Sequence, residues 1–110
     1  MGLTKTENFT SAQNDLAIMA KALAHPARIA ILQEIFKSKT CICGDLVDQI
    51  NLSQSTISQH LKELKTAGLI KGTIEGTSVC YCIDDNHWGL LKTTFNQFLN
   101  QHTSQQNECC

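Results

Sequence analysis

The hydrophobic pattern changes its period once, near Gly68, and this change restricts the fold more than any other feature. Before Gly68, apolar residues recur every three or four positions, as on the buried face of a helix. After it, apolar and polar residues alternate over 70–74 and again over 79–83, as they do in strands. A turn over 75–77 that contains a glycine separates the two stretches. The sequence therefore predicts a series of helices followed by one β-hairpin.

Local signals mark the ends of the predicted helices. Pro26 disfavours a helical residue before it and suits the first turn of a new helix. Gly68 tolerates the positive φ at which helices end. With Thr10 or Ser11 capping the first helix and Ser53 the fourth, five helices are expected, over about 11–24, 26–37, 44–50, 54–67 and 85–102. The predicted fold class is mainly α with one β-hairpin, a winged helix-turn-helix domain over 11–102. Residues 1–10 and 103–110 are expected to be flexible.

Composition excludes several classes of protein. The chain has 110 residues, 42% hydrophobic, and a formal net charge of −1, which fits one domain and excludes a strongly basic tail. It has no run of about 18 apolar residues, so we expect no membrane span, no signal peptide and a cytoplasmic location. The sequence offers no Gly-rich phosphate loop, no Cys-x-x-Cys and no nucleophile–His–acid order. We therefore expect neither an enzyme nor a small-molecule substrate.

The outward face of the helix over 54–67 is rich in short polar side chains that can contact base edges and phosphates in a major groove. These residues are Gln54, Ser55, Thr56, Ser58, Gln59, His60 and Lys62. Further DNA contacts are expected from Lys65 and Lys71 and from Gly76 and Thr77 at the hairpin tip. The predicted partner is double-stranded operator DNA.

The first and last helices carry more apolar residues than so small a core needs. These are Leu16, Met19, Leu23, Trp88, Leu91, Phe95 and Phe98. They are expected to form a homodimer interface, although they could instead close the core of the monomer. A dimer would read an inverted repeat with half-sites about 34 Å apart, which offsets the modest positive charge of one subunit.

Six cysteines fall in three close pairs, Cys41 with Cys43, Cys80 with Cys82, and Cys109 with Cys110. Paired soft ligands suggest a thiophilic metal or metalloid, since a reducing compartment keeps thiols free. The alternative is that some are small buried hydrophobic residues or an accident of the tail. In the hairpin, Cys80 and Cys82 are expected to point to solvent, away from the apolar face, and they are the second choice as ligands.

Residues 16–91 resemble the ArsR/SmtB family of metal-responsive transcriptional repressors. The likeness is carried by residues 21–32, 52–64 and 67–70 and by the hairpin ending in Tyr81. The resemblance implies a homodimer that represses an operon without any cofactor and releases DNA when an inducer binds.

The run from Cys41 to Leu46 resembles the family's arsenic-type site, with Gly44 as one extra residue before the aspartate. The resemblance implies As(III) or Sb(III) held by three thiolates, and the third would come from Cys109 or Cys110. Because residues two apart diverge on a helix and lie about 7 Å apart on a strand, we expect binding of the metalloid to demand a local turn at 41–43. Cd(II) or Pb(II) remains an alternative inducer, and so does oxidation of the thiols to disulfides or polysulfides.

Overall fold

The computed structural model describes residues 8–39, 41–44, 49–75 and 78–104. Its elements, in chain order, are α1 (Ser11–Ala22), α2 (Pro26–Ser38), β1 (Ile42–Cys43), α4 (Gln54–Thr66), β2 (Ile70–Glu75), β3 (Ser78–Ile83) and α5 (Asp85–Leu99). The described residues form four helices rather than the five expected. The helix expected over 44–50 falls largely on residues 45–48, which lie outside the described part of the chain, as do 1–7 and 105–110.

The helices begin at the residues that the sequence indicated. Thr10 caps α1 in a capping box with Gln13, each side chain accepting a hydrogen bond from the other's backbone N–H at 3.0 Å. Pro26 is the first residue of α2, and the His25 side chain caps that helix. The Ser53 hydroxyl accepts from the N–H of Thr56 at the start of α4. At the other end of the chain, α5 stops at Leu99, earlier than the expected residue 102.

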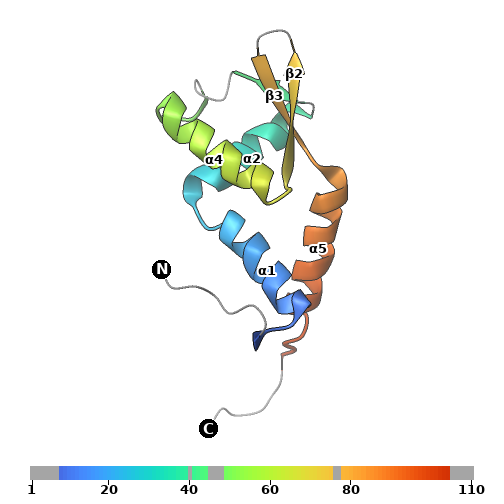
Figure 1. Cartoon of the computed structure of the whole chain (residues 1–110). Coiled ribbons are helices and arrows are strands. Elements are labelled where there is room, and N and C mark those ends of the chain that lie inside the picture. The colour runs from blue at the N-terminus through green and yellow to red at the C-terminus, as the bar shows by residue number, and fades with distance from the viewer. Residues whose placement is uncertain (1–7, 40, 45–48, 76–77, 105–110) are drawn as a thin grey trace.

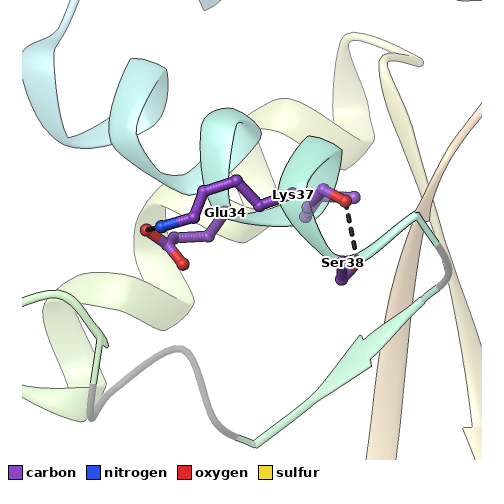
Figure 2. Close-up of polar contacts among 4 residues, drawn as sticks. Glu34, Lys37 and Ser38 are labelled. Carbon is purple, nitrogen blue, oxygen red and sulfur yellow. Dashed lines mark hydrogen bonds and ion pairs between the residues drawn. The ribbon is translucent and has the colours of Figure 1, made fainter.

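The C-terminal end of α2 turns the chain toward β1 (Figure 2). The Ser38 hydroxyl donates to the carbonyl oxygen of Ile35 at 2.7 Å, and Lys37 pairs with Glu34 at 3.4 Å. Lys39 then takes a left-handed conformation with φ of 61°, which stops the helix. The next described residues, from Cys41, run as extended chain into β1.

The expected single hairpin is part of a three-stranded sheet in the order β1-β3-β2, with both pairs antiparallel. β1 pairs with β3, with Ile42 opposite Tyr81 and Cys43 opposite Cys80. Periodicity could not predict β1, because two residues are too few to show an alternation. The sheet therefore gains an edge strand that comes directly after α2.

The core lies where α2, α4 and the sheet meet. Its most buried side chains include Ile31 of α2, Leu64 of α4, and Leu69 and Ile70 at the start of β2. α1 and α5 lie side by side at the end of the molecule away from the hairpin (Figure 1), and Leu91 joins them to the core. This arrangement fixes two faces of α2, one against α4 and the other against β3.

Gly68 and Gly89 give a matched pair of tests. Gly68 has a φ of +86°, and a Cβ there would lie 3.0 Å from the His87 ring. We expect Gly68→Ala to lower the free energy of unfolding by about 1–2 kcal/mol, the usual cost of left-handed geometry. Gly89→Ala, inside α5 with open space around it, should raise that free energy by about 0.5–1 kcal/mol. Urea unfolding checks both, and a Gly68→Ala variant as stable as the parent would contradict the assignment.

Candidate DNA-binding surface and thiol cluster

α4 has two faces of opposite character. Its buried face carries Ile57, Leu61 and Leu64, which hold the helix against α2 and β2. The predicted contact residues on the other side are exposed, namely Gln54, Ser55, Thr56, Ser58, Gln59, Lys62 and Lys65. Amide, hydroxyl and ammonium groups of this kind suit hydrogen bonds to base edges and phosphates. α4 therefore offers a continuous polar surface on a helix whose other side is packed into the core.

At the N-terminus of α4, three hydroxyls already interact. The Ser53 Oγ lies 3.2 Å from that of Ser55 and 2.9 Å from that of Thr56. Beyond the C-terminal end of the helix, Lys71 at the start of β2 is exposed. The predicted contacts at Gly76 and Thr77 lie outside the described residues.

His60 does not share the exposed face, and its expected position toward DNA is wrong. Its side chain is 8% exposed and accepts a hydrogen bond from Nε of Arg28 at 3.2 Å. The His25 ring packs against it with centroids 4.3 Å apart. Arg28 also donates to the carbonyl oxygens of Lys21 and Ala22, at 3.2 and 3.4 Å. His60 thus links α4 to the junction of α1 and α2. Its spacing from Ile57 and Leu64 indicated a buried position, which was not predicted from the sequence.

The same environment acts on the charge of His60. Burial lowers the pKa of His60 below 6.5, the positive charges of His25 and Arg28 lower it further, and Glu63 opposes them. The neutral ring is the form that accepts from Arg28 at Nδ1. Protonation would remove this acceptor and place a second positive charge beside the guanidinium.

The structure brings two of the three cysteine pairs together. Cys41 forms a disulfide with Cys82, and Cys43 forms one with Cys80, with Cα–Cα distances of 4.3 and 4.1 Å. The cross-strand register explains the pairing, because Cys43 lies directly opposite Cys80 and the same alignment carries Cys41 to Cys82. We refer to these four residues as the thiol cluster. Cys109 and Cys110 lie outside the described residues.

Two expectations about the cysteines are wrong. Cys80 was expected to point to solvent, but it is only 1% exposed and is bonded to Cys43 of the neighbouring strand β1. Cys80 and Cys82, the wing pair, were also expected to lie away from Cys41 and Cys43, whereas they are bonded to them. The two Cys-x-Cys motifs carried a usable signal, since equal spacing lets two strands pair residue for residue. Ile42 and Cys43 form β1, and the positive φ of +78° is at Gly44; the turn at 41–43 on metalloid binding stays a prediction.

A cleft of about 290 Å³ opens beside the disulfide between Cys41 and Cys82, which we call the outer disulfide. Ile35, Phe36 and Ile83 form its apolar wall, and Lys39 and Asp85 line it together with Cys41 and Cys82. Cys41 is exposed and Cys82 half-buried, so the outer disulfide is accessible while Cys80 is enclosed. Within the described residues and with the cysteines paired as disulfides, no group of three or more His, Cys, Asp or Glu is placed to hold a metal ion.

The predicted dimer residues divide between the core and the surface. Leu91 is buried in the core of the monomer, so that residue is not available to a partner. Met19, Leu23, Trp88 and Phe95 are partly buried against the core, and Phe98 is exposed. Three exposed apolar residues on α1 and α5 were not in the predicted set, namely Ile18, Leu90 and Leu99.

A polar, exposed helix seated on α2 and followed by a β-hairpin defines the winged helix-turn-helix class. Similar proteins agree with this. The chain is 42% identical over 69 residues to the transcriptional repressor SmtB of Mycobacterium tuberculosis, covering 63% of this chain and 50% of that protein. It is 36% identical to an uncharacterized helix-turn-helix transcriptional regulator from Methanocaldococcus jannaschii, covering 66% of this chain and 82% of the relative. No helix of the described residues has the length and apolar character needed to cross a membrane.

Among solved structures, the fold matches the homodimeric winged helix-turn-helix DNA-binding domain of a possible ArsR-family regulator from Mycobacterium bovis. The TM-score is 0.62 at 23% identity, over 96% of this chain and 98% of that one. The family model for bacterial regulatory proteins of the arsR family matches residues 25–71. The chain belongs to the arsR family, although it spans only about half the length of the SmtB repressor. These relatives are named as regulators, in agreement with the expectation that the chain is not an enzyme.

The buried position of His60 predicts a pH-dependent stability. Because its pKa is lower in the folded chain than in the unfolded one, its contribution is complete above about pH 6.5 and is lost as the pH falls toward the folded pKa. We expect His60→Gln to flatten the dependence of the unfolding free energy on pH in the range below about pH 6.5. His102→Gln, at an exposed position after α5, is the control. An unchanged slope in His60→Gln, measured by urea unfolding across that range, would contradict this reading.

Proposed function

We propose that the chain is a DNA-binding transcriptional repressor, active as a homodimer, whose release from its operator is controlled at the thiol cluster. The proposal rests on one observation, that the cysteines at β1 and the exposed polar face of α4 lie close together along the chain. The exposed polar face of α4 suits a major groove. β1, which holds Cys43 and directly follows Cys41, lies between α2 and α4 in the chain. A change at β1 can therefore alter how α4 is presented.

DNA recognition is assigned to the exposed residues of α4, with Lys71 as a phosphate contact. Gln54, Ser58 and Gln59 offer amide and hydroxyl groups for base edges, and Lys62 and Lys65 offer charge for phosphates. His60 acts behind this surface, through its hydrogen bond with Arg28. The modest charge of one subunit favours binding of two half-sites in an inverted repeat.

The homodimer is supported by an apolar surface on α1 and α5. Ile18, Leu90, Phe98 and Leu99 are each more than half exposed, a cost that a partner subunit would remove. The Mycobacterium bovis domain of the same fold is a homodimer. A symmetric interface through these helices would set the two α4 helices at a fixed distance.

For the inducer we propose As(III) or Sb(III), bound through Cys41 and Cys43. The sequence predicts a third thiolate from Cys109 or Cys110. The short cross-strand distances support Cys80 or Cys82 instead, since a sulfur already lies beside each member of the first pair. An allosteric coupling of about 1–3 kcal/mol would reduce DNA affinity about 5- to 150-fold.

A second candidate is a repressor controlled by oxidation, and the disulfides favour it. Joining Cys41 to Cys82 and Cys43 to Cys80 links β1 covalently to the wing. A peroxide could drive this change: each hydrogen peroxide oxidises two thiols to one disulfide and is reduced to two water molecules, and an alkyl hydroperoxide gives one alcohol and one water. DNA release would then follow oxidation without any metalloid.

The test is fluorescence anisotropy of the reduced full chain on DNA upstream of its own gene. We expect tight binding that arsenite weakens within the 5- to 150-fold range above. Cys41→Ser/Cys43→Ser should bind DNA as well as the parent but no longer respond to arsenite. Cys109→Ser/Cys110→Ser is the matched control and should respond as the parent does.

Two results would redirect the proposal. Tight DNA binding that ignores arsenite but is lost with peroxide would replace the metalloid with the redox candidate. Failure of the reduced chain to bind any DNA segment upstream of its gene, at low salt and micromolar protein, would contradict the repressor itself.

A further inference from the structure

A second cleft, of about 370 Å³, lies where the C-terminal ends of α1 and α4 meet the start of α2. Its lining residues are different from those of the cleft beside the outer disulfide. We propose that this second cleft binds a free α-amino acid with an apolar side chain. The binding itself does not depend on the proposed function, and only its regulatory meaning rests on it.

Three apolar side chains line the cleft, Ile18 and Ala22 of α1 and Ala67 at the end of α4. The two alanines are short and leave room for an apolar group, and Ile18 is 57% exposed. The volume lies in the range of about 300–1,000 Å³ that is usual for small-molecule pockets. Of the lining residues, only Ile18 also belongs to the apolar surface assigned above to the dimer, so the cleft lies at the edge of that surface. An apolar side chain bound here would cover part of Ile18, and this burial favours binding.

Three charged residues line the same cleft, namely Lys21, Arg28 and Glu63. The two cations suit a carboxylate, and the carboxylate of Glu63 suits an ammonium group. A free α-amino acid carries both groups on one carbon atom, so it matches all three charges. A simple carboxylic acid would place a like charge near Glu63, and a simple amine would meet two cations. The charges of the cleft therefore favour a zwitterion.

Arg28 is already held in position for such a ligand. Its Nε donates to His60 at 3.2 Å, and one terminal nitrogen donates to the carbonyl oxygens of Lys21 and Ala22 at 3.2 and 3.4 Å. These two nitrogens make the hydrogen bonds of Arg28 within the described chain, and the other terminal nitrogen has two further N–H groups. Because the guanidinium is already ordered, a carboxylate that binds it loses little side-chain entropy.

The ends of two helices favour the ammonium group of the ligand. α1 ends at Ala22 and α4 ends at Thr66, and both residues line the cleft. The C-terminal end of a helix carries a partial negative charge, which attracts a cation and repels an anion. The Thr66 hydroxyl can also accept a hydrogen bond from an ammonium group. Together with Glu63, these helix ends distinguish the proposed amino acid from a simple organic anion.

A ligand in this cleft would join three helices. Lys21 belongs to α1, Arg28 to α2 and Glu63 to α4, so one bound molecule contacts all three. It would stabilise the position of α4 that the hydrogen bond between Arg28 and His60 also maintains. In a repressor such a ligand raises the affinity for DNA, and DNA raises the affinity for the ligand by the same factor.

The experiment uses ¹H–¹⁵N correlation spectra of the reduced full chain, titrated with L-leucine as the probe. We expect saturable shifts of the backbone amides around 21–22 and 63–67, with a Kd of about 0.1–1 mM. The compound 4-methylpentanoate lacks the ammonium group of L-leucine, and 3-methylbutylamine lacks its carboxylate. Each should bind at least about 5-fold more weakly, the upper range for one exposed ion pair.

Variants separate a ligand contact from a structural effect. Glu63→Gln should weaken the binding of L-leucine about 5-fold but not that of 4-methylpentanoate, which has no ammonium group. Lys21→Gln should weaken the binding of both carboxylates. Thr66→Phe, at an exposed position, should fill the cleft and abolish binding. Lys37→Gln, exposed on α2 and outside the cleft, is the matched control and should bind as the parent does.

Two results would overturn the inference. One is the absence of saturable shifts at the cleft up to about 10 mM L-leucine. The other is a Glu63→Gln variant that weakens L-leucine and 4-methylpentanoate equally, because a purely structural effect would do so.

Ligand binding is measured without DNA, so the two proposals can fail separately. A chain that binds L-leucine at the cleft but binds no operator would leave this inference standing and remove the repressor. Operator binding that arsenite weakens, in a chain with no L-leucine site, would do the reverse. Operator binding that saturating L-leucine does not tighten would remove the regulatory meaning of the site.

Discussion

The antiparallel pairing of β1 with β3 is the constraint on which the arrangement of the thiol cluster depends. It places Cys43 opposite Cys80 and Ile42 opposite Tyr81, so one face of the pair joins the core and the other collects thiols. β1 follows directly from α2, whose end is fixed by Ser38 and the left-handed Lys39. The cysteines are therefore attached to the same helix that supports α4. The thiol cluster thus lies next to α2 in the chain, and α2 packs against both β3 and α4.

α4 is held from behind by both apolar and polar contacts. Ile57, Leu61 and Leu64 supply the buried area, and His60 adds a hydrogen bond from Arg28 that links α4 to the α1–α2 junction. A buried polar pair of this kind costs desolvation but allows few alternative geometries, since an unpaired His60 would be penalised. The orientation of the polar surface is thus set by residues on the opposite, buried side of α4. The residues that hold α4 in place are therefore different from the residues that it exposes for recognition.

Much of the fold could be predicted from the sequence because its signals are local. Thr10, Pro26, Ser53 and Gly68 mark helix ends through hydrogen bonds and backbone conformations that need only near neighbours. The burial of His60 was also within reach, since it continues the spacing of Ile57, Leu61 and Leu64, but its polar character suggested a DNA contact instead. Exposed Ile18, Leu90 and Leu99 were missed because neither helix shows which apolar residues the core leaves uncovered.

The pairing of the cysteines in the thiol cluster could not be predicted from local sequence patterns. A two-residue strand has no period, so nothing in the sequence located β1 at the edge of the hairpin. Without that strand, Cys80 and Cys82 were expected to face solvent, and the third thiolate was sought in Cys109 and Cys110. The wing pair became a partner of Cys41 and Cys43 only through a contact between residues about 40 positions apart.

The pairing of the cysteines across β1 and β3 is tested most directly by peptide mapping of the air-oxidised full chain without reduction. Trypsin cleaves after Lys39, Lys62, Lys71 and Lys92, so Cys41 and Cys43 fall in peptide 40–62 and Cys80 and Cys82 in peptide 72–92. The account predicts that these two peptides are recovered joined, and that fragmentation locates bonds from Cys41 to Cys82 and from Cys43 to Cys80. Separate peptides with an internal bond, or either peptide joined to the tail peptide 93–110, would contradict it.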